Sequence, residues 1–229
     1  MTHLSEVTSK MTQAAKNSGR KPEDVRLIAV SKTKPLTAVT SLASEGQIDF
    51  GENTIQDAET KIPHCKNLTW HFIGHLQSNK TKYMPELFDW VHTIDSLKLV
   101  TRINAAAISG KKTINLLLQV NVANDKDKTG LRVNDLFPMA EQILNSSFSG
   151  IALKGVMTIG RKNATKDQSR QTFEALRQLA ENAAQEFGTE YFSELSMGMS
   201  DDFEMAIEEG ATMVRVGAAL FGGRGAHPI

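Results

Sequence analysis

A regular alternation of short apolar runs with helix-like segments most constrains the fold. Eight apolar runs predict strands, at about 26–31, 48–50, 68–73, 90–93, 114–122, 153–158, 192–196 and 212–216. Segments with apolar residues at helical spacing stand between them, the longest at 168–187, and another helix precedes the first strand. Strict alternation of this kind indicates parallel strands joined by right-handed crossovers.

Eight strand–helix units in 229 residues match the count and size of a (β/α)8 barrel. We therefore predict one α/β barrel domain spanning residues 1–229, with an extra N-terminal helix. A doubly wound open sheet gives the same alternation and is the alternative. The missing glycine fingerprint after the first strand weakens a dinucleotide-binding version of that alternative.

Composition excludes several classes of partner. The chain has 26 basic and 26 acidic residues, so no net field recruits nucleic acid or an anionic membrane. No apolar segment is long enough to span a bilayer, and the N-terminus lacks a signal-peptide pattern. The single cysteine, Cys65, excludes an internal disulfide framework, and the histidines show no metal-ligand spacing. A cytoplasmic protein with no metal site is expected.

Lys32 stands directly after the first predicted strand. Barrel active sites lie at the carboxyl ends of the strands, so this lysine is expected at the mouth of the barrel. Between apolar walls and an open mouth, a lysine can lose its proton and attack a carbonyl group. The alternative is a lysine that extends its ammonium group into water.

Polar residues also follow the other predicted strands. The run from Ser196 to Ser200 and the pair Gly217-Ala218 offer hydroxyls, small residues and backbone N–H groups that suit a phosphate. Alternatively, Ser200 is a helix cap and Gly217 a tight turn. Met199 lies between two of these candidate phosphate contacts. The amino-terminal ends of the strands, for example Arg26, show no comparable set.

Arg215 lies inside an apolar strand end and needs hydrogen-bond acceptors, because arginine is rarely buried without a partner. A carboxylate such as Glu194 would serve, and so would a ligand nitrogen. The sequence leaves both possibilities open.

Five motifs carry a resemblance to a known family. They are Ala29-Val30-Ser31-Lys32-Thr33-Lys34, Phe50-Gly51-Glu52-Asn53, Trp70-His71-Phe72-Ile73-Gly74-His75-Leu76-Gln77-Ser78-Asn79-Lys80, Leu195-Ser196-Met197-Gly198-Met199-Ser200-Asp201-Asp202 and Met213-Val214-Arg215-Val216-Gly217. In this order, across nearly the whole chain, they resemble the pyridoxal phosphate homeostasis proteins. The resemblance implies a barrel like the N-terminal domain of alanine racemase, with pyridoxal 5'-phosphate (PLP) bound.

The family's site residues carry over by position. The resemblance implies that Lys32 forms a Schiff base with PLP, that Asn53 flanks the ring and that Arg215 faces the pyridine nitrogen. It also implies a phosphate site, with these residues at or near it: Ser200, Gly217, Ala218, Ser196 and Met199. Many members of the family that the chain resembles have threonine at the position of Ala218. One hydrogen bond to the phosphate is therefore expected to be missing.

An amino-acid racemase is the rival within the resemblance. Alanine racemases use the lysine and a tyrosine from a second domain as two bases. This chain ends soon after the last strand, and its two tyrosines, Tyr83 and Tyr191, are not at strand exits. Two residues depart from the pattern typical of racemases. Ile159 stands at the position of a histidine, and Lys128 stands at the position of an arginine. These departures predict no catalytic residue and no turnover.

We therefore expect a monomeric protein that binds, buffers and transfers PLP, with PLP-dependent apoenzymes as candidate acceptors. A cofactor-free aldolase is a second hypothesis, because Lys32 and the phosphate cradle would also suit a sugar-phosphate ketone. A regulatory or RNA-binding module has little support from the charge balance. Lys34 and Lys128 stay open as secondary aldehyde sites.

Overall fold

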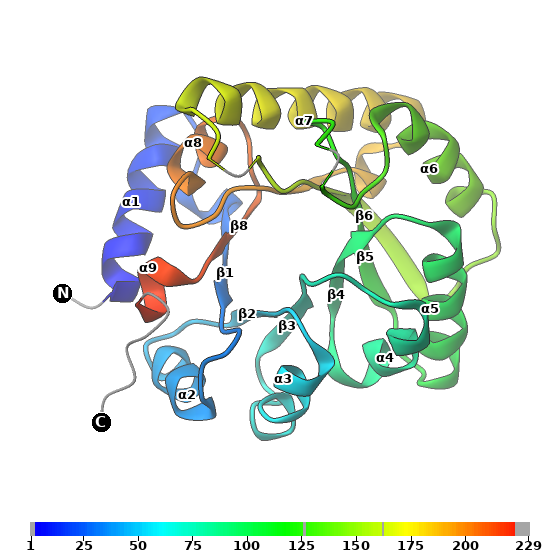
Figure 1. Ribbon diagram of the computed structural model, residues 1–229, viewed down its shortest axis with the longest axis horizontal. Coiled ribbons are helices and arrows are strands. Elements are labelled where there is room, and N and C mark those ends of the chain that lie inside the picture. Colours follow the sequence, from blue (N-terminus) through cyan, green and yellow to red (C-terminus); the bar gives the residue numbers. More distant parts are fainter. Residues whose placement is uncertain (1–2, 126, 162, 223–229) are drawn as a thin grey trace.

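The computed structural model describes residues 3–125, 127–161 and 163–222. Its eight strands close into a parallel barrel in chain order, which confirms the predicted (β/α)8 fold (Figure 1). The strands are β1 (Arg26–Val30), β2 (Asp49–Glu52), β3 (Thr69–Phe72), β4 (Trp90–Ile94), β5 (Ile114–Gln119), β6 (Ile151–Met157), β7 (Glu194–Ser196) and β8 (Met213–Val216). The α-helices are α1 (His3–Asn17), α2 (Leu36–Ser44), α3 (Ile55–Glu59), α4 (Met84–Leu87), α5 (Leu97–Ser109), α6 (Leu136–Leu144), α7 (Lys166–Phe187), α8 (Phe203–Glu208) and α9 (Ala218–Phe221).

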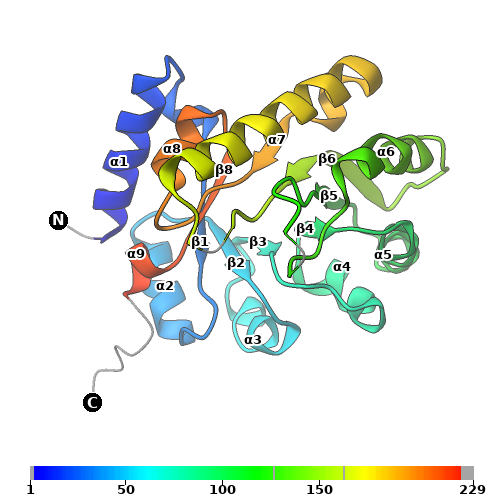
Figure 2. The same cartoon turned by 45° about the horizontal axis from the view of Figure 1, so that its top comes forward.

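The helices surround the barrel, and their ends follow local sequence signals (Figure 2). The longest helix, α7, begins after Thr165, whose hydroxyl accepts a hydrogen bond from the backbone of Gln168 in a capping box. The extra helix α1 lies against α8, and Arg20 donates to the carbonyls of Ile207 and Ala211 at 2.9 and 2.8 Å.

Within the described residues, no helix has the length and apolar character needed to cross a membrane.

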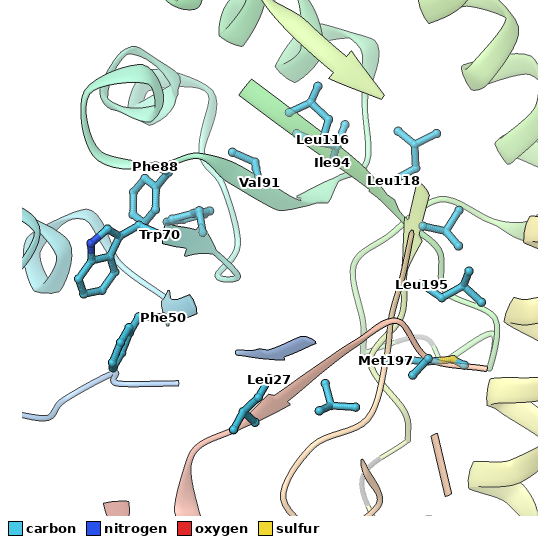
Figure 3. Close-up of a cluster of buried hydrophobic side chains, with 14 of the residues drawn as sticks. Leu27, Phe50, Trp70, Phe88, Val91, Ile94, Leu116, Leu118, Leu195 and Met197 are labelled. Atoms are coloured by element: carbon cyan, nitrogen blue, oxygen red, sulfur yellow. The ribbon is translucent and has the colours of Figure 1, made fainter. Parts of the chain in front are cut away.

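Strand alternation divides the core into two layers. Side chains that point outward, such as those of Leu27, Phe50, Trp70 and Leu116, pack with the helices in one continuous cluster (Figure 3). Phe50 and Trp70 contact one another from neighbouring strands, with ring centroids 5.6 Å apart. Such burial is the main favourable contribution to folding.

The inner layer of the barrel is small and partly polar. Its apolar cluster is made of Ile28, Trp90, Leu117, Met157 and Met213. The same alternation places several polar side chains on the inward face of their strands, although barrel interiors are usually filled by branched apolar residues. Among them are Asp49, His71, His92, Ser196 and Arg215, and Arg26 and Glu194 share the inward faces of β1 and β7.

Candidate functional site

Lys32 lies two residues beyond the end of β1, at the carboxyl mouth of the barrel. Its side chain is half-buried, and its Nζ has no hydrogen bond or ion pair with any residue that the structure describes. The structure thus places a primary amine, without a protein partner among these residues, where barrel enzymes bind their ligands.

The backbone on both sides of Lys32 is held by buried side chains. The Lys61 ammonium donates to the Ser31 carbonyl at 2.8 Å and to Glu52 at 2.7 Å, and the Ser31 hydroxyl donates to the same carboxylate at 2.6 Å. Asp57 accepts from the N–H of Thr33 at 2.8 Å. The cluster is not evident in the sequence, because Lys61 follows a short helix and has the pattern of a solvated lysine.

Backbone N–H groups from the loops after β7 and β8 converge on one hydroxyl. Ser200 Oγ accepts from the N–H of Gly217 at 3.2 Å and of Ala219 at 3.5 Å. The N–H groups of Ser200 itself and of Ala218 have no acceptor in the described part of the chain. Two loops therefore present several N–H donors at one place, which suits an oxyanion.

The reading of Ser200 as the cap of the following helix is wrong. Helix α8 begins at Phe203, and the Asp202 carboxylate accepts from the N–H of Met199 at 2.7 Å at this end. Gly217 instead brings the loop after β8 close to the end of β1. A Cβ at Gly217 would lie 3.2 Å from the Val30 carbonyl oxygen and 3.3 Å from the Val30 Cβ.

Arg215 is buried, and its acceptors differ from the carboxylate considered above. Its Nη1 donates to Ser196 Oγ at 2.7 Å and its Nη2 to the Thr158 carbonyl at 2.9 Å. Glu194 instead accepts from Arg26 and from the Thr212 hydroxyl, so the alternative that Glu194 pairs with Arg215 is wrong. Burial lowers the pKa of Arg215 to about 10, so the guanidinium is still charged at neutral pH and offers only donors.

The remaining candidates also lie at the carboxyl end of the barrel. Asn53 follows β2 and is half-buried, and the register that pairs Val30 with Gly51 brings the end of β2 beside the end of β1. Met199 is 42% exposed, and Ala218 is also exposed, on the loops after β7 and β8.

Lys34 and Lys128 both donate to backbone carbonyls. Lys34 Nζ lies 3.1 Å from the Phe221 oxygen and 3.3 Å from the Gly222 oxygen, and Lys128 donates to the Gly160 carbonyl. In this respect both differ from Lys32.

The amino-terminal ends of the strands also carry charged side chains, which pair with one another. Arg26 at the start of β1 lies 3.4 Å from Glu194 and 3.9 Å from Asp49. Lys112 pairs with Asp89 at 2.8 Å on the same side of the barrel. These pairs are not evident in the sequence, because each joins residues at the starts of different strands, whose relative heights are set only when the barrel closes. Among the described residues, no group of three histidine, cysteine or acidic side chains is placed to hold a metal ion.

Comparison with known proteins places the chain in a family. Residues 3–225 match the family described as alanine racemase, N-terminal domain. The chain belongs to this family. The pyridoxal phosphate homeostasis protein of Escherichia coli (strain K12) is 40% identical over 229 residues, which are 97% of this chain and 95% of that protein. The protein of the same name from Pseudomonas aeruginosa is 41% identical over 224 residues, 97% of this chain and 94% of its own length.

Solved structures of this family have the same barrel. PipY of Synechococcus elongatus PCC7942, solved with PLP bound, superimposes with a TM-score of 0.82 at 36% identity, covering 93% of this chain and 100% of PipY. PipY without PLP gives a TM-score of 0.83. An alanine racemase of Clostridium difficile 630 shares the fold with a TM-score of 0.72 at 14% identity, over 96% of this chain and 57% of the racemase.

Proposed function

We propose that this protein binds PLP reversibly at Lys32 and holds it for transfer to PLP-dependent apoenzymes, without catalytic turnover of its own. The observation that carries the proposal is the shared location of three features at one end of the barrel. An amine without a protein partner among the described residues, converging backbone N–H donors and a charged arginine all lie there. They match the aldehyde, the phosphate and the ring nitrogen of PLP.

Each candidate residue has a role that its surroundings support. When bound, PLP supplies an aldehyde that condenses reversibly with a primary amine, with release of water. Lys32 provides that amine, and the cluster of Lys61, Glu52 and Asp57 holds its backbone in place. Asn53 would border the ring from the neighbouring strand end.

The loops after β7 and β8 hold the phosphate. Ser200 would donate its hydroxyl, and the N–H groups of Ser200 and Ala218 would complete the donor set, with Met199 covering this side. The N–H of Gly217 donates to Ser200 Oγ and so holds that hydroxyl at the phosphate site. A larger side chain at Gly217 would press against Val30, so the small residue keeps the loop close to Lys32. Ser196 and Arg215 would form the far wall, where the guanidinium, which offers only donors, would face the ring nitrogen and favour its unprotonated form.

The relatives support PLP over the phosphorylated ketone of an aldolase. PipY is 36% identical and was solved with PLP bound, and the curated relatives near 40% identity are named pyridoxal phosphate homeostasis proteins. The family is also related to racemases, which use a tyrosine as their second base. The proposal that this protein has no turnover therefore depends on where its two tyrosines lie. Tyr191 precedes β7, at the end of the barrel opposite to Lys32, and the ring of Tyr83 lies 5.0 Å from Lys82 and 5.6 Å from Lys80.

A transfer assay tests this function. Protein loaded with PLP and freed of excess cofactor is mixed with a PLP-dependent apoenzyme, and the recovered activity is followed over time. We expect reactivation, and we expect that the loaded protein alone leaves L-alanine and other L-amino acids unracemised. Racemisation at ordinary enzymatic rates would contradict the proposal.

The phosphate site is tested with Ser200→Ala, which we expect to weaken PLP binding about tenfold, as for loss of one hydrogen bond to a charged group. Ser193→Ala is the matched control, because Ser193 is exposed and precedes β7 at the other end of the barrel. Equal PLP affinities of the two variants would show that Ser200 does not bind the phosphate.

A further inference from the structure

A continuous series of hydrogen bonds crosses the interior of the barrel. Asp49 Oδ1 lies 2.9 Å from His71 Nε2, and His71 Nδ1 lies 2.9 Å from His92 Nε2. His92 Nδ1 lies 2.9 Å from Ser196 Oγ, which accepts from Arg215 Nη1 at 2.7 Å. We call these five residues the interior network. It begins at the amino-terminal end of β2 and ends at the arginine of the candidate site.

The two ends of the interior network fix the direction of every bond in it. The Asp49 carboxylate only accepts, so His71 must carry its proton on Nε2 and accept at Nδ1. His92 must then donate from Nε2 and accept at Nδ1. Its acceptor nitrogen takes the hydroxyl hydrogen of Ser196, which leaves the lone pairs of Ser196 for the guanidinium. Both histidines are neutral in this arrangement.

The surroundings of the histidines support this assignment. His71 and His92 are fully buried, and that burial lowers the pKa of both imidazoles, most strongly for His92. Trp90 stacks on His71 with centroids 5.8 Å apart, which fixes the plane of that ring. A polar group buried in the barrel interior destabilises the fold unless it has hydrogen-bond partners. A fully connected network at this place is therefore rigid and suits a functional role.

We propose that Asp49, His71, His92 and Ser196 are positioning residues that hold the Arg215 guanidinium in the orientation used toward the ring nitrogen of PLP. Asp49 sets the tautomer of His71, this tautomer sets that of His92, and Ser196 is left as an obligatory acceptor for Arg215. The assignment of Arg215 to the ring nitrogen rests on the proposed function, whereas the direction of the interior network does not.

The direction is tested on the protein without PLP by long-range ¹H–¹⁵N NMR of ¹⁵N-histidine-labelled protein at pH 7. We expect His71 and His92 to be neutral, with both protons on Nε2. In Asp49→Ala, His71 is released from this constraint, and we expect the spectrum of His92 to change as well, although His92 does not contact Asp49. An Nδ1–H tautomer or a charged imidazole in the wild-type protein would overturn the proposal, and so would an unchanged His92 in the variant.

The consequence for the site is tested by PLP titration. We expect Ser196→Ala and Asp49→Ala to weaken PLP binding about three- to thirtyfold, the range found for coupling through packed networks. Asn104→Ala is the matched control, since Asn104 is buried on α5 and its Oδ1 accepts from the Gly150 N–H outside the barrel. It should change the affinity less than about twofold and leave the histidine spectra unchanged.

Asp49→Asn is the second variant in case Asp49→Ala does not fold. Its amide can accept or donate, so we expect a mixture of tautomers at both histidines. Affinity losses in Asn104→Ala equal to those in Ser196→Ala would overturn the positioning role. If no variant and not even the wild type binds PLP at Lys32, the proposed function is wrong, while the histidine tautomers still decide the direction of the network.

Discussion

The N–H of Thr33 donates a 2.8 Å hydrogen bond to Asp57, and Thr33 has a φ of +62°. The residue directly after Lys32 is therefore a β-branched residue in the left-handed region, a conformation that costs about 1–3 kcal/mol and persists only where the surroundings impose it. Asp57 holds it together with the turn hydrogen bond from the N–H of Lys34 to the Ser31 carbonyl, which is 3.0 Å long. The orientation of Lys32 thus depends on a carboxylate from α3.

We predict that Asp57→Ala weakens PLP binding about tenfold, because Thr33 relaxes and carries Lys32 with it. Adding Thr33→Gly should restore most of the affinity, since glycine adopts a positive φ without strain. The dissociation constants of the wild type and the two variants, from absorbance titrations, provide the check. A double variant as weak as Asp57→Ala alone would contradict the account.

The buried pair of Lys61 and Glu52 should be important for stability. Both side chains are almost fully buried, with 2.7 Å between Nζ and Oε1, and Glu52 Oε2 is the one fully buried side-chain oxygen or nitrogen without a hydrogen bond among the described residues. Lys61→Met should lower the free energy of unfolding by about 3–5 kcal/mol, because it leaves a buried carboxylate without its cation.

Urea unfolding at pH 8 measures this loss. Adding Glu52→Gln should recover much of it, since the amide oxygen still accepts from Ser31. Lys16→Met, at an exposed position of α1, is the control and should change stability by less than about 0.5 kcal/mol. Equal effects of the two lysine substitutions would show that the pair contributes little.

The buried histidines predict a pH dependence of stability. The pKa values of His71 and His92 are lowered by burial, so the folded protein binds fewer protons than the unfolded chain below about pH 6.5. The free energy of unfolding should therefore fall as the pH drops from about 6.5, by up to about 1.4 kcal/mol per pH unit for each histidine.

Unfolding curves between pH 8 and 5 test this slope. Burial raises the pKa of Glu52, which acts in the opposite direction at low pH, so the comparison with a variant is decisive. His92→Gln should reduce the slope, and His64→Gln, at an exposed position, should not. A slope that is the same in all three proteins would contradict the assignment.

Much of the fold could be predicted from local sequence, because a parallel strand buried on both faces gives a continuous apolar run. The fifth strand was nevertheless predicted too long, to Val122, whereas β5 ends at Gln119. The segment from Val120 to Val122 is partly buried because it lies beside Leu131, which follows the polar loop. The backbone of Val120 and Asn121 pairs with Leu131 there. Local hydrophobicity does not distinguish these two environments.

The candidate site was predicted in part. Lys32 and Ser200 could be placed, because they lie two and four residues after strands whose carboxyl ends meet in any parallel barrel. The partners of Arg215 and the contact between His71 and His92 could not, because they depend on the stagger between strands, which the closed barrel sets as a whole. A signal was present in the sequence: a single histidine inside each of two apolar strands.

The most direct test of the central claim is borohydride reduction of the PLP-loaded protein followed by peptide mapping. We predict that wild-type protein shows a visible absorbance band that reduction abolishes, and that the modified residue is Lys32. Lys32→Ala should lack both the band and the label, while Lys34→Ala keeps them. A label on any other lysine, or an unchanged band in Lys32→Ala, would contradict the account.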